Sequence, residues 1–454
     1  MLLGRSQETK NLETYYEREG SQLVVLYGRE NVGKTSLLMD FCRDKSYSYY
    51  LARPCSEKEQ LYLWSKEVQS DFKAFDVECE FSSIFSAITT VKSPKKIIVI
   101  DEFQFIVKTS TQFMKEIINL IHNAWNNQPV LVVLCSSSIG FIENTMVSKI
   151  GQSAYEITGF LKVKELNFLD LVRKFSKYSV EQCVEVYSIL GGVPGLWRYF
   201  NQNLSVKENI CRTILKQGTV LYDEARRFVS EELREPTVYH TILEAIASGD
   251  EKLNDLYLKT DYSRAKISVY LKNLMELEIV EKIYSIDTAG RENTKKGIYR
   301  ISNHFVYFWF RYLFPNLSKL QLMTEEEFYD QYIADTLRNY TASSFTSVCM
   351  EYLNLLNQSG KLELKYQRAG SWVGKVGTID IAAVSDSGKT LVGICNWEHS
   401  IMTYEDYEWL LFCAEQARMN TDYIYLFTVG GFDEKLHAES KIKGYIHLID
   451  LSQL

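Results

Sequence analysis

Apolar residues in the first 160 positions gather in short unbroken runs instead of alternating with polar ones. Such runs occupy residues 23–27 (LVVLY), 97–100 (IIVI) and 130–134 (VLVVL). Strands that are buried on both faces of a parallel sheet have this pattern. The first part of the chain is therefore predicted to form an α/β fold.

The pattern changes after residue 160. Residues 161–235 have the periodicity of short amphipathic helices, and residues 236–302 predict three helices followed by a β-hairpin. Residues 303–330 contain an aromatic-rich run, whose apolar side chains we expect to be buried. Residues 331–454 predict the order helix, strand, strand, strand, helix, strand. We therefore expect several domains in one chain.

Composition and charge exclude several classes of protein. The chain has 454 residues, 46% of them apolar, and a net charge of −7, so any contact with nucleic acid has to come from a local basic patch. Nine cysteines without a CxxC pair indicate reduced thiols. The start MLLGRSQETK lacks the features of a signal peptide, and no run approaches about 18 uncharged apolar residues. We expect a cytoplasmic protein without a membrane span.

The segment GRENVGKT, residues 28–35, follows the first apolar run and precedes another. Its spacing is GxxxxGK[ST], in which backbone N–H groups and a helix N-terminus form a nest for phosphates. Lys34 would reach the β- and γ-phosphates, and Thr35 would bind Mg²⁺. The alternative is a plain tight turn. The residues predicted to bind nucleotide here are Gly28, Asn31, Val32, Gly33, Lys34, Thr35 and Ser36.

A second signal lies at the end of the run in KKIIVIDEFQF, residues 95–105. Asp101 at the carboxyl end of a buried strand can hold Mg²⁺, and Glu102 can polarise the attacking water, so Lys34, Asp101 and Glu102 are the predicted catalytic residues. A capping Asp beside a solvated Glu is the alternative. Ser137, after the third run, is a candidate γ-phosphate sensor or else a helix cap.

Together these motifs resemble those of AAA+ and STAND-type P-loop ATPases, and more narrowly those of an archaeal and bacterial ATPase family that joins this core to a winged helix and a nuclease-like tail. The resemblance implies ATP and Mg²⁺ as cofactors. LLGRSQETK resembles the family's N-terminal box, which places Arg5 near the adenine, and GGVPGLWRYF, residues 191–200, resembles its lid motif, which places Pro194 against the base. Arg198 is a weaker candidate for a γ-phosphate sensor than for a surface residue.

One departure from the family concerns turnover. The family has a Tyr-Gly-Arg segment before the last strand of the core, where this chain has Ile150-Gly151-Gln152. If that arginine helps hydrolysis in relatives, binding of ATP would survive here and turnover could be slow.

Residues 236–302 read as a winged helix-turn-helix. Between residues 236 and 300 ten Lys/Arg balance ten Asp/Glu, so a purely structural role competes with contact to double-stranded DNA. The candidate DNA-binding residues lie on the third helix and on the wing: Arg264, Lys266, Lys272, Arg291, Lys295 and Lys296.

The tail resembles a PD-(D/E)xK nuclease whose chemistry is degraded. Asp380 fits the strand aspartate, but Ile394 and Asn396 stand where the family has Glu and Lys, and Thr346 stands where it has Glu. A single carboxylate binds Mg²⁺ poorly, because hard cations need several oxygen ligands. Glu351 or Glu398 would have to replace the lost groups. We expect no cleavage, and a retained fold that binds a protein partner or DNA.

The domains expected from the resemblance are a P-loop ATPase core (1–160), a helical lid (161–235), the winged helix (236–302), an aromatic connector (303–330) and the degenerate nuclease-like domain (331–454). The leading hypothesis is an ATP-dependent molecular switch with slow hydrolysis. The alternatives are a DNA-binding regulator or defence component in which ATP is structural, and an ATP-dependent nuclease with a rewired site.

Overall fold

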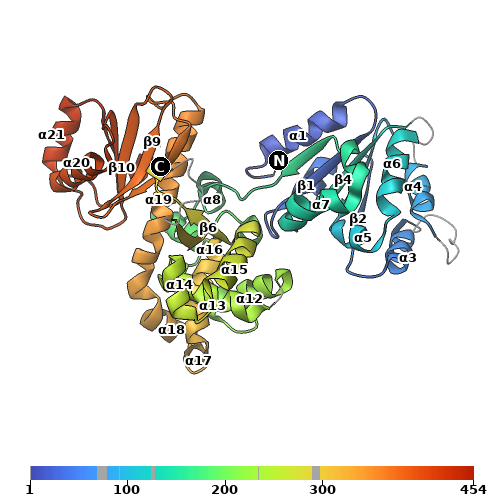
Figure 1. Ribbon diagram of the computed structural model, residues 1–454, viewed down its shortest axis with the longest axis horizontal. Helices are drawn as coiled ribbons and strands as arrows, with labels where there is room; N and C mark the ends of the chain where they lie inside the picture. Colours follow the sequence, from blue (N-terminus) through green and yellow to red (C-terminus); the bar gives the residue numbers. More distant parts are fainter. Residues whose placement is uncertain are drawn as a thin grey trace. The chain divides into compact units, whose positions relative to one another are not determined.

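The computed structural model describes residues 2–68, 79–90, 93–123, 128–233, 235–288 and 297–453. The chain divides into two compact units, shown as ribbons in Figure 1. The first unit consists of residues 1–166 together with 193–195, and the second contains the remaining residues.

The first unit is built around a five-stranded sheet in the order β2-β3-β4-β1-β5, and every pair of neighbouring strands is parallel. Its strands are β1 (Gln22–Tyr27), β2 (Tyr47–Leu51), β3 (Lys96–Asp101), β4 (Val130–Ser136) and β5 (Gly159–Lys162). The helices are α1 (Ser6–Glu17), α2 (Lys34–Cys42), α3 (Glu57–Val68), α4 (Phe81–Thr89), α5 (Gln104–Thr109), α6 (Phe113–Asn123) and α7 (Met146–Ile150), followed by the 3₁₀ helix η4 (Gly151–Glu156).

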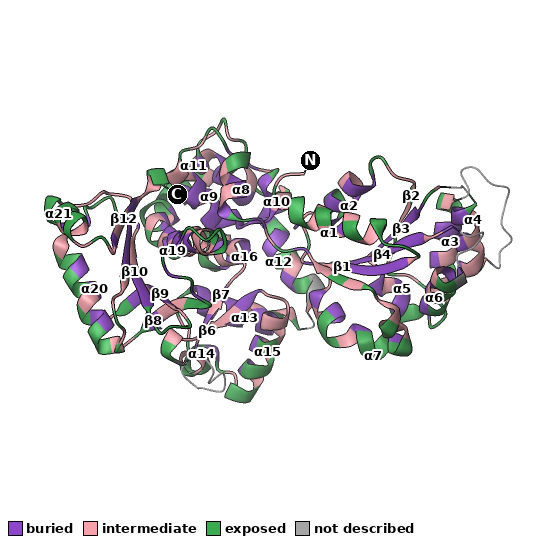
Figure 2. Cartoon of the chain, turned by 90° about the horizontal axis from the view of Figure 1, so that it is seen from above, coloured by how far each residue is buried: buried purple, intermediate pink, exposed green. Residues whose placement is uncertain are grey.

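Helices cover both faces of this sheet. Leu12 of α1 and Leu38 of α2 pack on one face in a cluster with strand residues such as Val24. Side chains of α3 to α7 pack on the other face, against alternate strand residues such as Val25. β3 and β4 are buried along their whole lengths, and they are among the strands drawn in purple in Figure 2. The α/β fold with a parallel sheet is therefore as predicted.

The second unit begins with helices, as the amphipathic pattern after residue 160 predicts. They are α8 (Phe168–Lys174), α9 (Val180–Leu190), α10 (Pro194–Trp197), which the two units share, α11 (Val206–Asn209) and α12 (Val220–Glu232). Three further helices and a hairpin follow: α13 (Pro236–Ala247), α14 (Leu253–Thr260), α15 (Arg264–Glu276), β6 (Val280–Ile283) and β7 (Ile298–Ile301).

The aromatic run is buried, as expected. It forms α16 (His304–Phe308) and the π-helix η7 (Trp309–Leu313) that continues it, in which Trp309 and Phe310 are almost completely covered. The indole N–H of Trp309 donates to the carbonyl oxygen of Tyr222 at 2.8 Å. These aromatic rings therefore form part of the hydrophobic core of the second unit.

The C-terminal part of the second unit contains a separate five-stranded sheet in the order β12-β11-β10-β9-β8. It is mixed: β8 to β10 are antiparallel neighbours, and β10 to β12 are parallel. In Figure 1, α19 lies on one side of this sheet and α20 and α21 lie on the other. The elements are α17 (Leu317–Leu320), α18 (Glu325–Tyr332), α19 (Ala334–Gln358), β8 (Arg368–Val373), β9 (Thr378–Val384), β10 (Thr390–Asn396), α20 (Tyr404–Ala417), β11 (Tyr423–Thr428), α21 (Glu434–Ile442) and β12 (Ile446–Asp450).

One boundary and the element order of the tail differ from the sequence prediction. Strand β5 runs to Lys162, so a core that ends at residue 160 would cut through a strand. The tail has a further helix and strand, α21 and β12, beyond the predicted order. Within the described residues, no helix has both the length and the apolarity that crossing a membrane requires.

Candidate functional site

The predicted phosphate loop joins β1 to α2. Asn31 and Gly33 adopt positive φ angles of 62° and 96°, a conformation that glycine adopts without strain and asparagine tolerates. Gly28 lies so close to the next chain segment that a Cβ would come within 2.2 Å of the Val163 carbonyl oxygen. The loop is therefore held in a tight curve at the carboxyl end of β1, where the main chain itself is the available binding surface.

Lys34, the first residue of α2, is buried beneath this loop. Its ammonium group donates to the carbonyl oxygens of Gly28 and Arg29, at 2.8 Å in each case. The positive charge is thus held inside the curve of the loop, where an anion would be bound.

Thr35 and Asp101 meet at the carboxyl ends of the strands. The Thr35 hydroxyl donates to Asp101 Oδ2 at 3.0 Å, and the hydroxyl of Tyr49 on β2 donates to the same oxygen at 2.8 Å. Burial, followed by the nearby Asp101 charge, raises the pKa of Tyr49, so this phenol stays a donor. A hydroxyl and a carboxylate at the end of a phosphate loop fit an oxygen-liganded Mg²⁺.

Glu102 follows Asp101 in an unusual conformation, with a φ of 53°. Its Oε2 accepts hydrogen bonds from the Ser137 hydroxyl at 2.7 Å, from the Ser137 N–H at 3.2 Å and from the Gln104 amide. The two predicted residues, Glu102 and Ser137, are thus brought together. In this structure the hydroxyl of Ser137 donates its hydrogen bond to the carboxylate of Glu102.

Arg5 is buried, with 2% of its surface exposed. Its guanidinium donates to the Val32 carbonyl oxygen at 2.6 Å and pairs with Glu8 at 2.8 Å. Arg5, at the N-cap of α1, therefore supports the phosphate loop.

The segment 193–195 also reaches this loop. The N–H of Gly195 donates to the Asn31 carbonyl oxygen at 2.9 Å, and a Cβ on Gly33 would lie 3.6 Å from Pro194 Cγ. Pro194 therefore lies beside the phosphate loop, and its contact with the nucleotide base stays a prediction. Thr35 and Ser36 are exposed. Arg198 is also exposed, and its guanidinium lies 4.8 Å from the ring centroid of Tyr199.

The candidate DNA-binding residues of α15 have partners of their own. Arg264 stacks on Tyr257 at 3.8 Å, Lys266 lies 4.6 Å from the Tyr262 ring centroid, and Lys272 lies 3.7 Å from Glu276. Arg291, Lys295 and Lys296 lie outside the described residues.

Asp380 lies on β9 of the C-terminal sheet and accepts a hydrogen bond from the Cys395 N–H at 2.9 Å. Burial raises the pKa of its carboxyl group, and this hydrogen bond lowers it in part. Glu351 is used elsewhere, accepting from the Phe168 N–H and the Tyr187 hydroxyl, and Glu398 faces Arg338 at 3.5 Å. In the described part of the chain, no cluster of three or more His, Cys, Asp or Glu residues is arranged to hold a metal ion.

The sequence reasoning missed Tyr49, Gln104 and Glu8. Tyr49 donates a hydrogen bond to Asp101 from a neighbouring strand. Gln104 donates to Glu102, and Glu8 accepts from Arg5. The register that pairs Tyr49 with Val99 of β3 is set by tertiary structure, so no local spacing signals the contact with Asp101.

A parallel sheet with this loop, lysine and aspartate defines the class of P-loop ATPases. Comparison with known families agrees: residues 2–200 match a family described as an ATPase domain predominantly from Archaea. Residues 309–408 match a family described as archaea bacterial proteins of unknown function. The predicted resemblance is thereby confirmed over residues 2–200 and 309–408, where the chain is similar to these two families.

Similar proteins come from Methanocaldococcus jannaschii. The uncharacterized protein MJECL04 is 28% identical over 394 residues, which cover 86% of this chain and 85% of that protein. The uncharacterized ATP-binding protein MJ1076 is 23% identical over 316 residues, which cover 61% of this chain and 91% of that protein.

Solved structures with similarity include the Walker-type ATPase paby2304 of Pyrococcus abyssi, with a TM-score of 0.48, 19% identity, and coverage of 68% of this chain and 96% of that one. The ORC2 protein of Aeropyrum pernix, solved as ADPNP–ADP complexes, has a TM-score of 0.47 and 14% identity, and covers 71% of this chain and 95% of that one.

Proposed function

We propose that this protein is an ATP-binding molecular switch with slow ATP hydrolysis. The observation that carries the proposal is the hydrogen bond of 3.0 Å between Thr35, in the phosphate loop, and Asp101, at the end of β3. This pairing of a hydroxyl with a carboxylate supports the assignment of both side chains to the Mg²⁺ of a bound nucleotide. The match of residues 2–200 to an ATPase family supports the same conclusion.

The residues around the loop fit ATP and Mg²⁺. The amides of residues 28–36, including Asn31, Val32 and Gly33, would hold the phosphates, and Lys34 would exchange its carbonyl partners for phosphate oxygens. Thr35 and Asp101 would hold Mg²⁺, which when bound offsets the charge of the β- and γ-phosphates. Arg5 and Pro194 would border the nucleotide.

Glu102 is the proposed group for orienting the attacking water. Its Oε2 already accepts from Ser137 and Gln104, so the carboxylate has to exchange partners before it can accept from water. Gln152 also occupies the position where the family has an arginine. Both observations support slow turnover.

The remaining parts would respond to the nucleotide. We propose a core that extends through β5 to Lys162, a helical lid from there to residue 235, a winged helix over 236–302, a connector over 303–330 and a nuclease-like domain without cleavage over 331–454. The three helices, of which α14 contacts both α13 and α15, followed by the β6–β7 hairpin, support the winged-helix assignment.

The test of nucleotide binding is Lys34→Ala. We expect the affinity for Mg·ATP, measured by equilibrium titration, to fall at least about tenfold, since Lys34 supplies a charge-assisted contact to phosphate. Lys10→Ala, at an exposed position on α1, is the matched control and should bind as the unchanged protein does. Wild-type affinity in Lys34→Ala would remove the assignment.

A second candidate function is DNA binding through α15, which the exposed side chains of Arg264 and Lys272 support. Salt-dependent binding of duplex DNA that weakens in Arg264→Ala would favour it, whereas a gel shift without affinity for any duplex would exclude it. Plasmid cleavage in Mg²⁺ or Mn²⁺ that Asp380→Ala abolishes would instead show a working nuclease site.

A further inference from the structure

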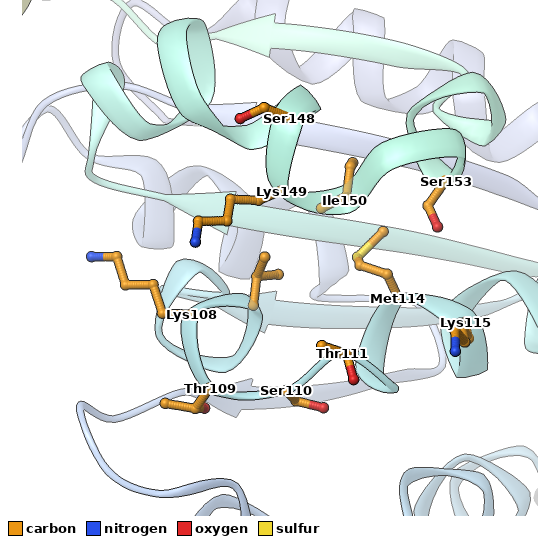
Figure 3. A pocket seen from close by; sticks show the side chains of 11 residues that line it. Lys108, Thr109, Ser110, Thr111, Met114, Lys115, Ser148, Lys149, Ile150 and Ser153 are labelled. Atoms are coloured by element: carbon orange, nitrogen blue, oxygen red, sulfur yellow. The ribbon is translucent and has the colours of Figure 1, made fainter.

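A pocket of about 370 Å³ lies in the first unit, on the helical side of the sheet that carries α5, α6 and α7. It is lined by the end of α5, the turn into α6, and the junction between α7 and η4 (Figure 3). None of the residues assigned to the nucleotide site lines it.

The charges of this pocket all have one sign. Lys108 on α5, Lys115 on α6 and Lys149 on α7 line it, and the described lining residues include no Asp or Glu. Glu57 on α3 contacts the lining, because its carboxylate accepts a hydrogen bond from the hydroxyl of Ser110. In a chain with a net charge of −7, this is a local positive field.

The three lysines have no ion-pair partners within the described parts of the chain, and all three are exposed. Figure 3 shows Lys108 and Lys149 ending on the same side of the pocket, and Lys115 standing on the other side. Ammonium groups placed around one hollow repel one another, and an anion between them would turn this repulsion into attraction.

Uncharged donors complete the lining. Thr111 and Ser153 border the pocket, and neither hydroxyl has a hydrogen-bond partner among the residues that the structure describes. Hydroxyl groups donate to phosphate oxygens, and lysine contributes a compact positive charge to such sites.

We propose that this pocket is a binding site for a small polyphosphate anion, separate from the phosphate loop. Its volume lies at the lower end of the range for ligand pockets, which suits a compact ligand of two or three phosphate groups. Three lysines around one hollow fit such a ligand better than a duplex, whose phosphates would need an extended row of cations along the surface.

The location gives such a ligand a route to the nucleotide site. Helix α5 starts two residues after Glu102, and the segment from β4 to α7 contains Ser137, the hydrogen-bond partner of Glu102. An anion held by both Lys108 and Lys149 would tie these two segments together. The binding site itself does not depend on ATP turnover.

The test uses the full chain carrying Lys34→Ala, which weakens competing binding in the phosphate loop, and inorganic tripolyphosphate as the probe in isothermal titration. Adding Lys108→Ala and Lys149→Ala should reduce the affinity at least tenfold. Adding Lys10→Ala and Lys174→Ala, at two exposed lysines that do not line the pocket, removes the same charge and should leave the affinity within about twofold.

Equal losses in the two sets of variants would overturn the proposal, because they would show only a general effect of charge. Absence of binding at millimolar tripolyphosphate in 0.1 M salt would overturn it as well. The same holds if a duplex oligonucleotide binds more tightly than tripolyphosphate and depends on Lys108 and Lys149, since the lysines would then serve nucleic acid.

Discussion

At the scale of single residues, Tyr49 holds Asp101 in place from the neighbouring strand. Removing its hydroxyl in Tyr49→Phe leaves Thr35 as the remaining side-chain donor to Asp101 Oδ2. A hydrogen bond to a charged group contributes about 1.5–3 kcal/mol, so we expect the Mg²⁺ concentration for half-maximal ATP binding or turnover to rise about tenfold. A Mg²⁺ titration at saturating ATP measures this change.

Tyr47→Phe is the matched control for this change. Tyr47 lies two residues earlier on the same strand with 42% of its surface exposed. An unchanged Mg²⁺ requirement in Tyr49→Phe, or an equal rise in both variants, would contradict a positioning role for the Tyr49 hydroxyl.

Glu185 on α9 makes the stability of the second unit depend on pH. Burial and the nearby Glu181 raise the pKa of Glu185 from 4.5 to about 7, and Arg338 lowers it in part. Because the folded state binds this proton more tightly, the stabilisation is complete below pH 4.5 and is lost as the pH rises to about 7. We expect Glu185→Gln to remove a decrease on the order of 3 kcal/mol over this window.

Denaturant unfolding at a series of pH values measures the effect. Glu415→Gln replaces an exposed carboxylate on α20 and should leave the slope of stability against pH unchanged. If Glu185→Gln keeps the slope of the unchanged protein, Glu185 does not titrate in this window.

At the scale of elements, the turn after β1 depends on the missing side chain of Gly28. A Cβ at this position would come within 2.2 Å of the backbone oxygen of Val163, which cannot move without displacing the segment after β5. We expect Gly28→Ala to lower the free energy of unfolding by about 2 kcal/mol or more and to impair ATP binding.

Gly140→Ala provides the comparison. Gly140 has a helical φ of −59°, and a Cβ there meets no atom within 4 Å. This substitution should be neutral or stabilise by up to about 1 kcal/mol, because alanine restricts the unfolded chain. Equal stability of the two variants in thermal unfolding would contradict the close contact at Gly28.

The sequence predicts the central strands well and the edge strands poorly. β3 and β4 are buried along their whole lengths, so their apolar runs are unbroken. β2 and β5 form the two edges of the sheet and are partly exposed, and their mixed residues gave no clear strand signal. In the tail, α21 and β12 were missed, and β12 is likewise an edge strand.

The candidate site likewise has one part that the sequence predicts and another that it does not. The phosphate loop is predictable because all of its groups lie within residues 28–36, where spacing alone defines the geometry. The contacts of Asp101 with Tyr49 and of Glu102 with Ser137 join residues 52 and 35 positions apart. Such contacts depend on strand order, which a single sequence does not specify.

At the scale of the whole molecule, the chain path offers a mechanical link for the proposed switch. Residues 193–195 belong to the first unit, and the residues on either side of them, Gly192 and Leu196, belong to the second. The N–H of Gly195 is bonded to Asn31 in the phosphate loop. A change of the loop on nucleotide binding would therefore act on α10 itself, which contains Gly195 and continues into the second unit at Leu196.

Hydrogen–deuterium exchange with and without Mg·ATP tests this link. We expect slower exchange at residues 28–36 and 193–195, because bound phosphates occupy the loop amides, and changed exchange in α13 to α15 of the second unit. Lys34→Ala should abolish both effects, and Lys10→Ala should preserve them. Protection confined to the first unit would mean that ATP stabilises the core without switching the rest of the chain, since a ligand shifts only those equilibria whose states it binds with different affinity.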